Sequence, residues 1–139
     1  MAQKVRDVMS APPLVVGPKT SVVQVADVMR DEDIGTVLIA ENDRLIGLVT
    51  DRDLVVRILT RGGNVEEHAI TEACSEELIS VSPDDDIDRA IGLMRQHAVR
   101  RLPVTEGNRP VGIVALGDLA VERDPDSALA DISAAEPNQ

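Results

Sequence analysis

The stretch Gly47-Leu48-Val49-Thr50-Asp51-Arg52-Asp53-Leu54 decides the fold of this chain. Its apolar first half predicts a strand, and a helix with apolar residues at helical spacing is expected from Asp51 to Arg61. A helix that begins directly after a strand presents free backbone N–H groups, which suit a phosphate. The hydroxyl of Thr50 can donate to such a phosphate, and the carboxylate of Asp53 suits the paired hydroxyls of a ribose. The alternative is that Thr50 or Asp51 only caps the helix and Asp53 complements its dipole.

A second copy of this stretch, Gly112-Ile113-Val114-Ala115-Leu116-Gly117-Asp118-Leu119, begins 65 residues after the first. At this offset Val5–Leu54 aligns with Ile70–Leu119 without a gap, and many apolar positions are apolar in both copies. The chain is therefore a tandem repeat of two copies. The identical pairs are Ser10/Ser75, Val16/Val81, Pro18/Pro83, Met29/Met94, Arg30/Arg95, Glu41/Glu106, Arg44/Arg109, Gly47/Gly112, Val49/Val114, Asp53/Asp118 and Leu54/Leu119.

The composition limits the classes of function. The chain of 139 residues has a net charge of −11, which opposes binding to nucleic acid or to an anionic membrane. It contains no Phe, Tyr or Trp, so aromatic stacking on bases is excluded and the core is aliphatic. No apolar run approaches the length of a membrane span, and no signal peptide opens the chain, so a cytoplasmic protein is expected.

Cys74 is the only cysteine of the sequence. An intrachain disulfide is therefore excluded, which fits a reducing compartment. Because Cys74 aligns with Met9, we expect it to be a small packing residue rather than a reactive thiol.

Each copy is predicted to fold as a β-α-β-β-α unit. The predicted architecture is α/β with pseudo-twofold symmetry, in which each half is a three-stranded sheet with two helices on one face and neither half is stable alone. In the first copy Thr20 or Ser21 is expected to cap a helix whose apolar stripe runs from Val22 to Met29. The other expected elements are helical turns at Val5–Met9 and Ala69–Cys74, strands at Leu14–Val16, Thr36–Ala40, Leu45–Val49, Ile79–Val81, Arg101–Thr105 and Val111–Ala115, and helices at Asp84–His97 and from Gly117.

The repeat boundaries predict three regions. The first repeat is expected at residues 1–63, the second at 64–123, and a tail at 124–139. Within the tail, residues 127–132 are expected to form a short helix.

A tandem unit of this size that ends in Gly-apolar-apolar-Thr-x-x-Asp resembles the CBS (cystathionine-β-synthase) domain, and the pair resembles a Bateman module. The resemblance covers Val5 to Arg123 and includes Asp7-Val8-Met9 and Arg101-Leu102-Pro103-Val104. It implies a regulatory module that binds an adenosyl ligand (AMP, ADP, ATP, NAD or S-adenosylmethionine) in clefts between the repeats. It also implies a stand-alone module that acts on an unknown protein target and has no catalytic cofactor.

The resemblance assigns ribose binding to Asp53 and Asp118 and phosphate binding to Thr50, where the second copy has Ala115. In this family a polar residue often lies at the end of the first strand of each domain. This position holds Ser80 in the second copy but Val15 in the first. Full occupancy of two sites is therefore not implied. The expected ligand-binding residues are Val16, Ile34, Gly35, Thr50, Arg52, Asp53, Ser80, Arg100, Arg101 and Asp118.

Positive side chains near the expected sites are candidates for phosphate binding. One of the adjacent strand residues Arg100 and Arg101 is expected to face the ligand, since neighbouring strand residues point to opposite faces. Arg52 and His97 are further candidates, whereas Lys19 is interpreted as ordinary surface charge.

Three classes of function are compatible with the sequence. The first is a sensor of adenine nucleotides, the second an enzyme, and the third a ligand-free dimerisation module. An enzyme is disfavoured because His68, Cys74 and His97 form no catalytic or zinc-type spacing. A homodimer is expected because the helix after Asp51 carries more apolar residues than one sheet face needs: Leu54, Val55, Ile58 and Leu59.

Overall fold

The computed structural model describes residues 3–74 and 78–123. The chain divides into two compact units. One contains Pro13–Leu78 together with Gly107–Pro110, and the other contains Met1–Pro12, Ile79–Glu106 and Val111–Gln139. The expected helix at residues 127–132 lies outside the described residues.

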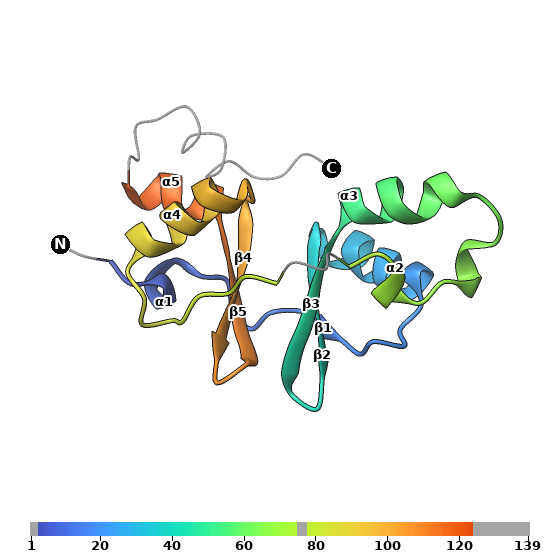
Figure 1. Cartoon of the computed structure of the whole chain (residues 1–139), viewed down its shortest axis with the longest axis horizontal. Coiled ribbons are helices and arrows are strands. Elements are labelled where there is room, and N and C mark those ends of the chain that lie inside the picture. The colour runs from blue at the N-terminus through green and yellow to red at the C-terminus, as the bar shows by residue number, and fades with distance from the viewer. Residues whose placement is uncertain (1–2, 75–77, 124–139) are drawn as a thin grey trace. The chain divides into compact units, whose positions relative to one another are not determined.

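The unit built around the first repeat has a three-stranded sheet in the order β1-β2-β3. β1 pairs parallel with β2, and β2 pairs antiparallel with β3. Figure 1 shows α2 and α3 on the same side of this sheet, as the sequence predicts. The bounds are β1 Val15–Val16, α2 Val22–Glu32, β2 Thr36–Glu41, β3 Arg44–Thr50 and α3 Asp51–Asp53.

The helix α2 begins where the sequence predicts. The Ser21 side chain accepts a hydrogen bond from the Gln24 backbone N–H at 3.1 Å, and the Gln24 side chain accepts one from the Ser21 N–H at 3.1 Å. This reciprocal pair is a capping box, which satisfies N–H groups that the first helical turn leaves unpaired. Ser21, rather than Thr20, is therefore the N-cap.

The predicted helix Asp51–Arg61 is helical throughout but changes type along its length. After α3 the chain forms a π-helix, η1 (Leu54–Ile58), and then a 3₁₀-helix, η2 (Leu59–Arg61). The segment contains Val55, Val56 and Ile58, whose branched side chains weaken the preference for a regular α-helix. Gly62 then ends it with a φ of 69°. The apolar periodicity predicted the helical segment but not its change to a π-helix and then to a 3₁₀-helix.

The unit built around the second repeat has a two-stranded sheet, β4-β5. Figure 1 shows α1, α4 and α5 on one side of it. Helix α4 and strands β4 and β5 begin and end 65 residues after α2, β2 and β3, so the repeat in sequence is a repeat in structure. The bounds are α1 Val5–Val8, α4 Ile87–His97, β4 Arg101–Glu106, β5 Arg109–Ala115 and α5 Leu116–Arg123.

The predicted strand Ile79–Val81 is reduced to one parallel bridge between Val81 and Val104. In the first repeat the Leu38 N–H donates to the Leu14 carbonyl at 2.9 Å. The matching residue of the second repeat is Pro103, which has no N–H to donate to Ile79. The three-stranded sheet expected for the second half is therefore a two-stranded sheet with a single bridge.

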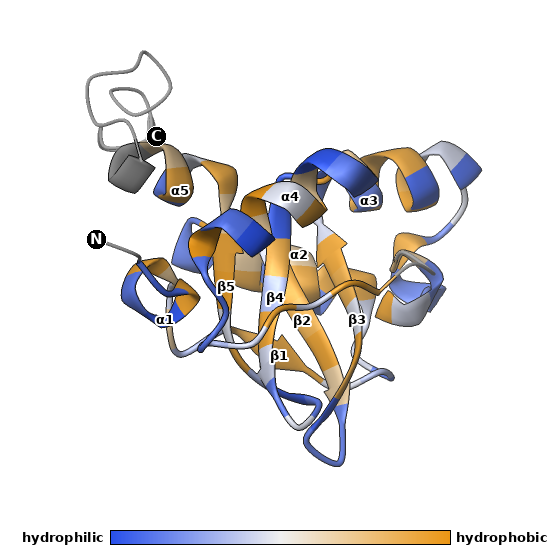
Figure 2. Cartoon of the chain, turned by 60° about the vertical axis from the view of Figure 1, so that its left-hand side comes forward, coloured by the Kyte–Doolittle hydropathy of each residue, from blue (hydrophilic) through white to orange (hydrophobic). Residues whose placement is uncertain are grey.

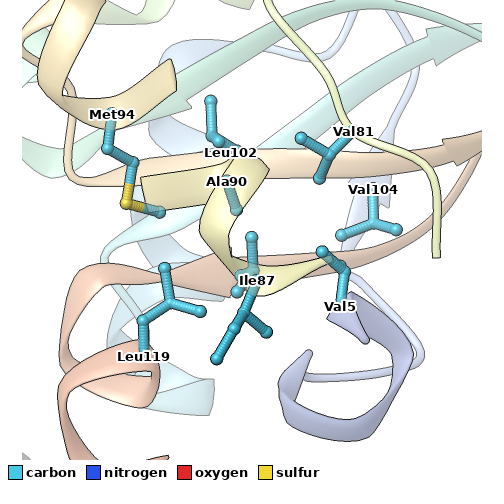
Figure 3. Packing of buried hydrophobic residues seen from close by; sticks show 9 residues of the cluster. Val5, Val81, Ile87, Ala90, Met94, Leu102, Val104 and Leu119 are labelled. Carbon is cyan, nitrogen blue, oxygen red and sulfur yellow. The ribbon is translucent and has the colours of Figure 1, made fainter. Parts of the chain in front are cut away.

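Each compact unit takes one helical turn from the other sequence repeat. Val5 of α1 is fully buried in the core of the unit that holds α4, β4 and β5, and Figure 3 shows it beside Ile87 and Val104. The matching residue Ile70, in the 3₁₀-helix η4 (Ile70–Glu72), is fully buried in the core of the first-repeat unit. The compact units and the sequence repeats therefore do not coincide.

The two cores are aliphatic, as the composition requires. Figure 2 shows the hydrophobic colouring of β2 and of the helical ribbon that continues from α3. The first core contains Val22, Val25, Met29, Val37, Ile39, Val49, Ile58, Ile70 and Ala73. The second contains Val5, Val81, Ile87, Ala90, Met94, Leu102, Val104, Val114 and Leu119.

Candidate functional site

Thr50 and Asp53 form a reciprocal pair at the junction of β3 and α3, where Figure 1 shows the helix starting as the strand ends. The Asp53 backbone N–H donates to Thr50 Oγ1 at 3.2 Å, and the Thr50 N–H donates to Asp53 Oδ2 at 2.9 Å. The alternative that Thr50 caps the helix is therefore correct as a description of the ligand-free protein.

Capping leaves both side chains with hydrogen-bonding capacity. Thr50 Oγ1 acts as an acceptor in the capping box, so its own hydrogen remains a donor. Asp53 Oδ1 lies 3.4 Å from Arg57 Nε, and the Asp53 side chain is 19% exposed. A carboxylate has about four acceptor positions, so Asp53 can accept further hydrogen bonds from a ligand. The pair can therefore cap the helix and bind a ligand together.

Gly35 lies against the same junction. Its carbonyl accepts a hydrogen bond from the Asp51 N–H at 3.0 Å, and a Cβ at Gly35 would lie 3.2 Å from Asp51 Oδ2. This spacing is tighter than most side chains accept, so the close approach favours glycine. The exposed side chain of Arg52 follows, and its backbone N–H donates to Asp51 Oδ1 at 2.8 Å.

Val16 and Ile34 are partly buried and pack against the aliphatic core of the same unit. The structure thus places the first-site candidates Val16, Ile34, Gly35, Thr50, Arg52 and Asp53 in one compact unit. It joins Thr50 to Asp53 by hydrogen bonds, and it brings Gly35 beside Asp51.

The second repeat preserves part of this junction. The Leu116 N–H donates to the Arg100 carbonyl at 2.8 Å, which matches the bond between Asp51 and Gly35. The Ala115 N–H donates to Asp118 Oδ2 at 3.3 Å. Because Ala115 has no side-chain oxygen, the reciprocal bond cannot form and the capping box is half complete.

The remaining second-site candidates lie in the same unit as Asp118. Ser80 is exposed, and its Oγ accepts a hydrogen bond from Thr105 Oγ1 at 3.3 Å. Arg100 and Arg101 are exposed and form no ion pair with any described residue. Their charge is available to an anion, whichever of the two faces it.

Sequence reasoning missed Thr36, the first residue of β2. Its side chain is buried, with 6% of the residue exposed, and its Oγ1 has no hydrogen-bond partner among the described residues. Thr36 pairs directly with Thr50 across β2 and β3. The signal was a threonine at the start of an otherwise apolar strand, aligned with Arg101 in the second copy.

The expected packing role of Cys74 agrees with its contacts. A Cβ at Gly47 would lie 3.0 Å from Cys74 Sγ, and in the second unit a Cβ at Gly112 would lie 2.7 Å from Met9 Sδ. In both units a sulfur therefore packs on a glycine of the last strand. Burial raises the pKa of the Cys74 thiol, which disfavours the reactive thiolate.

Residues 3–74 and 78–123 contain no group of three or more His, Cys, Asp and Glu side chains placed to hold a metal ion. They also contain no helix of the length and apolar character that crossing a membrane requires.

Comparison with known proteins identifies the repeat. The family model for the CBS domain matches residues 5–60 and 70–123. The CBS domain-containing protein YhcV of Bacillus subtilis is 37% identical over 133 residues, which cover 93% of this chain and 94% of YhcV.

Two solved structures share the fold. Hypoxic Response Protein I, solved with two coordinated zinc ions and found in Mycobacterium tuberculosis, is 34% identical; its TM-score is 0.77, and the match covers 86% of this chain and 98% of the other. The CBS domain pair of MJ0100, in complex with 5′-methylthioadenosine and S-adenosyl-L-methionine, is 21% identical with a TM-score of 0.81; the match covers 91% of this chain and 100% of the other. The chain belongs to the CBS domain family, and its two repeats are a tandem CBS pair.

Proposed function

We propose that this CBS pair is a regulatory module that binds an adenosine-containing ligand and is not itself an enzyme. The observation that carries the proposal is the pairing of Thr50 with Asp53, which leaves a hydroxyl donor and carboxylate acceptors at the start of a helix. The complex of the MJ0100 CBS pair with two adenosine derivatives supports the choice of ligand class. The ligand acts as a signal for a protein target in the cytoplasm rather than as a catalytic cofactor.

The first-repeat site is the stronger one for phosphorylated ligands. Thr50 can donate to a phosphate, whereas Ala115 leaves that phosphate to backbone N–H groups and arginine. A hydrogen bond to a charged group contributes about 1.5–3 kcal/mol. The two sites are therefore expected to differ in affinity by roughly tenfold to a hundredfold.

Calorimetric titration of the purified protein with AMP, ADP, ATP, NAD and S-adenosylmethionine tests the proposal. Asp53→Ala removes the acceptors for ribose and should abolish most of the binding, and Asp118→Ala should have the smaller effect. In thermal unfolding, a ligand at about 100 times its dissociation constant should stabilise the wild type by about 2.7 kcal/mol per site.

Asp51→Ala is a matched control for these variants, because Asp51 is an exposed carboxylate beside the same helix start. It should keep the binding that Asp53→Ala loses. If Asp118→Ala loses binding and Asp53→Ala keeps it, the ranking of the sites is wrong. If the wild type binds none of the five nucleotides, the alternative of a ligand-free dimerisation module replaces the proposal.

We also propose that the module is a homodimer, on the strength of an apolar groove between α2 and the segment that follows α3. The groove has a volume of about 240 Å³ and an almost entirely apolar lining. Ile58 belongs to the core, but Val55 and Leu59 are 54% and 61% exposed, so part of the predicted apolar surplus does lie at the surface. Its lining residues are Val22, Val23, Ala26, Asp27, Leu54, Val55, Ile58, Leu59 and Val65.

Sedimentation at micromolar concentration tests the assembly. The chain has a mass of 14.9 kDa, so a species of twice that mass is expected for the wild type. Leu59→Asp places a charge in the groove and should yield the monomer, whereas Leu78→Asp, at a residue 41% exposed outside the groove, should leave the mass unchanged. A wild type that sediments only as a monomer would rule out the dimer.

A further inference from the structure

The proposed first-repeat site requires a phosphate to bind close to a carboxylate. Asp53 is the proposed partner of the ribose, and Thr50, three residues before it, is the proposed partner of the phosphate. Like charges repel more strongly where protein displaces water, and only 19% of the Asp53 side chain is exposed. Unless a positive group offsets its charge, Asp53 therefore favours adenosine over any phosphorylated derivative.

Arg57 supplies such a positive group. Its Nε lies 3.4 Å from Asp53 Oδ1, whereas Asp53 Oδ2 accepts a hydrogen bond from the Thr50 N–H at 2.9 Å. One oxygen is therefore held by the backbone at the end of β3, and the other by a cation one helical turn further along, in η1. Each oxygen keeps a further acceptor position for a ligand.

The ion pair between Asp53 and Arg57 is not needed for the fold. The Arg57 side chain is 46% exposed, and an ion pair between residues four apart on the surface of a helix contributes little to folding stability. The positive charge has a larger effect on a second anion that comes close to Asp53. Arg57 can therefore be replaced in the folded protein, and the consequence is expected in ligand binding.

The second repeat lacks this cation. Asp118 accepts one hydrogen bond, from the Ala115 N–H at 3.3 Å, and the residue that matches Arg57 in the sequence is Glu122. The two repeats thus keep the aspartate and reverse the sign of the charge four residues after it. This reversal indicates that the residue at position 57 separates the ligand preferences of the two repeats.

We propose that Arg57 determines the ligand specificity of the first-repeat site by offsetting the charge of Asp53, so that the site accepts an adenosine derivative with an anionic phosphate. Arg57 acts through Asp53 and needs no contact with the ligand. The inference rests on the proposed function of the module. It predicts that the preference of this site for phosphorylated over uncharged adenosine depends on one arginine.

Calorimetric titration with adenosine, AMP and ATP tests this, in the full chain carrying Asp118→Ala so that the first-repeat site is measured alone. Arg57→Met keeps an unbranched side chain and removes the charge. It should weaken AMP binding about tenfold and ATP binding by more, and change adenosine binding less than about twofold. Arg57→Lys keeps the charge and should retain most of the AMP affinity.

Arg61→Met is the matched control. Arg61 lies in η2 of the same helical segment, and its Nη1 is 3.4 Å from Glu72 Oε1 rather than close to Asp53. This variant loses the same charge from the protein as Arg57→Met and should change the binding of none of the three probes. An equal loss of AMP binding in both variants would show that only the net charge matters and would overturn the inference.

A second variant separates an effect through Asp53 from a direct contact with phosphate. Asp53→Asn keeps the shape and one acceptor oxygen and removes the charge that Arg57 offsets. In the double variant Asp53→Asn, Arg57→Met, the ratio of AMP to adenosine affinity should return toward the ratio before both changes, although both affinities fall. If the ratio stays as low as in Arg57→Met alone, Arg57 acts on the phosphate directly and its role through Asp53 is wrong.

The outcomes separate this inference from the proposed function. If Arg57→Met binds AMP as well as its parent does, the role of Arg57 is wrong and the proposed function stands. If Arg57→Met weakens adenosine as much as AMP, the arginine supports the shape of the site and the specificity role is wrong. If the wild type binds AMP and Asp118→Ala does not, the ligand lies in the second-repeat site and the inference fails alone. If the wild type binds none of the three probes, both fail together.

Discussion

The two repeats differ most at the junction between their last strand and the following helix. In the first, Thr50 and Asp53 bond to each other in both directions; in the second, Ala115 and Asp118 share one bond. The backbone bond that crosses the junction is nevertheless present in both, from Asp51 to Gly35 and from Leu116 to Arg100.

The two repeats share the features that stabilise the fold and differ in the polar groups at the junction. The shared backbone bond and the aliphatic cores keep the two units alike, whatever the side chain at position 50 or 115. The polar side chains differ: the first repeat offers the hydroxyls of Thr36 and Thr50, and the second offers the charge of Arg101 at the position of Thr36. One fold therefore presents two different sets of polar groups at the two proposed sites.

The largest expected effect comes from the helical turn that each unit takes from the other repeat. Ile70 and its counterpart Val5 are both fully buried. Ile70→Ala should lower the free energy of unfolding by about 2–5 kcal/mol, and Val5→Ala should lower it by less because the cavity is smaller. Denaturant unfolding measures both. A loss below about 1 kcal/mol for Ile70→Ala would show that the turn contributes little to its unit.

The second expected effect concerns the short first strand. Leu38→Pro removes the N–H that pairs with Leu14 and should lower the free energy of unfolding, because proline in the middle of a sheet removes a hydrogen bond between strands. Pro103→Leu restores an N–H in the second repeat and should extend its strand. Amide hydrogen exchange at position 103 should then show protection, and fast exchange there would contradict our explanation of the missing strand.

The third expected effect exchanges the caps. Thr50→Ala should destabilise the protein by about 1 kcal/mol, and Ala115→Thr should stabilise it by a similar amount by completing the capping box. Thermal unfolding of the two variants and of the double exchange measures this. Destabilisation by Ala115→Thr would mean that the second junction does not accept the geometry of the first.

The smallest expected effect is a loss of folding stability at acidic pH. A hydrogen bond from His68 is the main cause that lowers the pKa of Glu72 from its ordinary 4.5, and Arg6 likewise lowers that of Asp84 from 3.8. A carboxylate whose pKa is lower in the folded state stabilises the protein above the unfolded-state pKa and loses that contribution as the pH falls through the folded-state value.

Thermal unfolding should therefore show stability that falls below pH 4.5, the ordinary value for Glu72. Glu72→Gln should lower the melting temperature slightly at pH 7 and should reduce the loss on acidification. Both carboxylates are exposed, so the effect is modest and shrinks in high salt. An acid loss that is unchanged in Glu72→Gln would mean that other carboxylates cause it.

The sequence by itself determined the repeat and most of the fold. A gapless offset of 65 residues and apolar positions at strand or helix spacing predicted α2, β2, β3 and their counterparts, because these elements are long enough to show their period. The turn residues between the paired strands were also readable, since Asn42 and Asp43, like Gly107 and Asn108, adopt a positive φ. The sequence offered Thr50 or Asp51 as the cap of the following helix, but it did not predict that Asp53 bonds back to Thr50.

Only the tertiary structure decided which segments share a core and which polar atoms lack a partner. Val5 and Ile70 belong to the unit of the other repeat, and local periodicity cannot predict this because it describes one face of a segment and not what covers it. The buried hydroxyl of Thr36 was equally invisible, since burial and hydrogen bonding depend on neighbours that are distant in the chain. The hydrophobic period of each element can be read from the local sequence, whereas long-range packing determines which elements share a core.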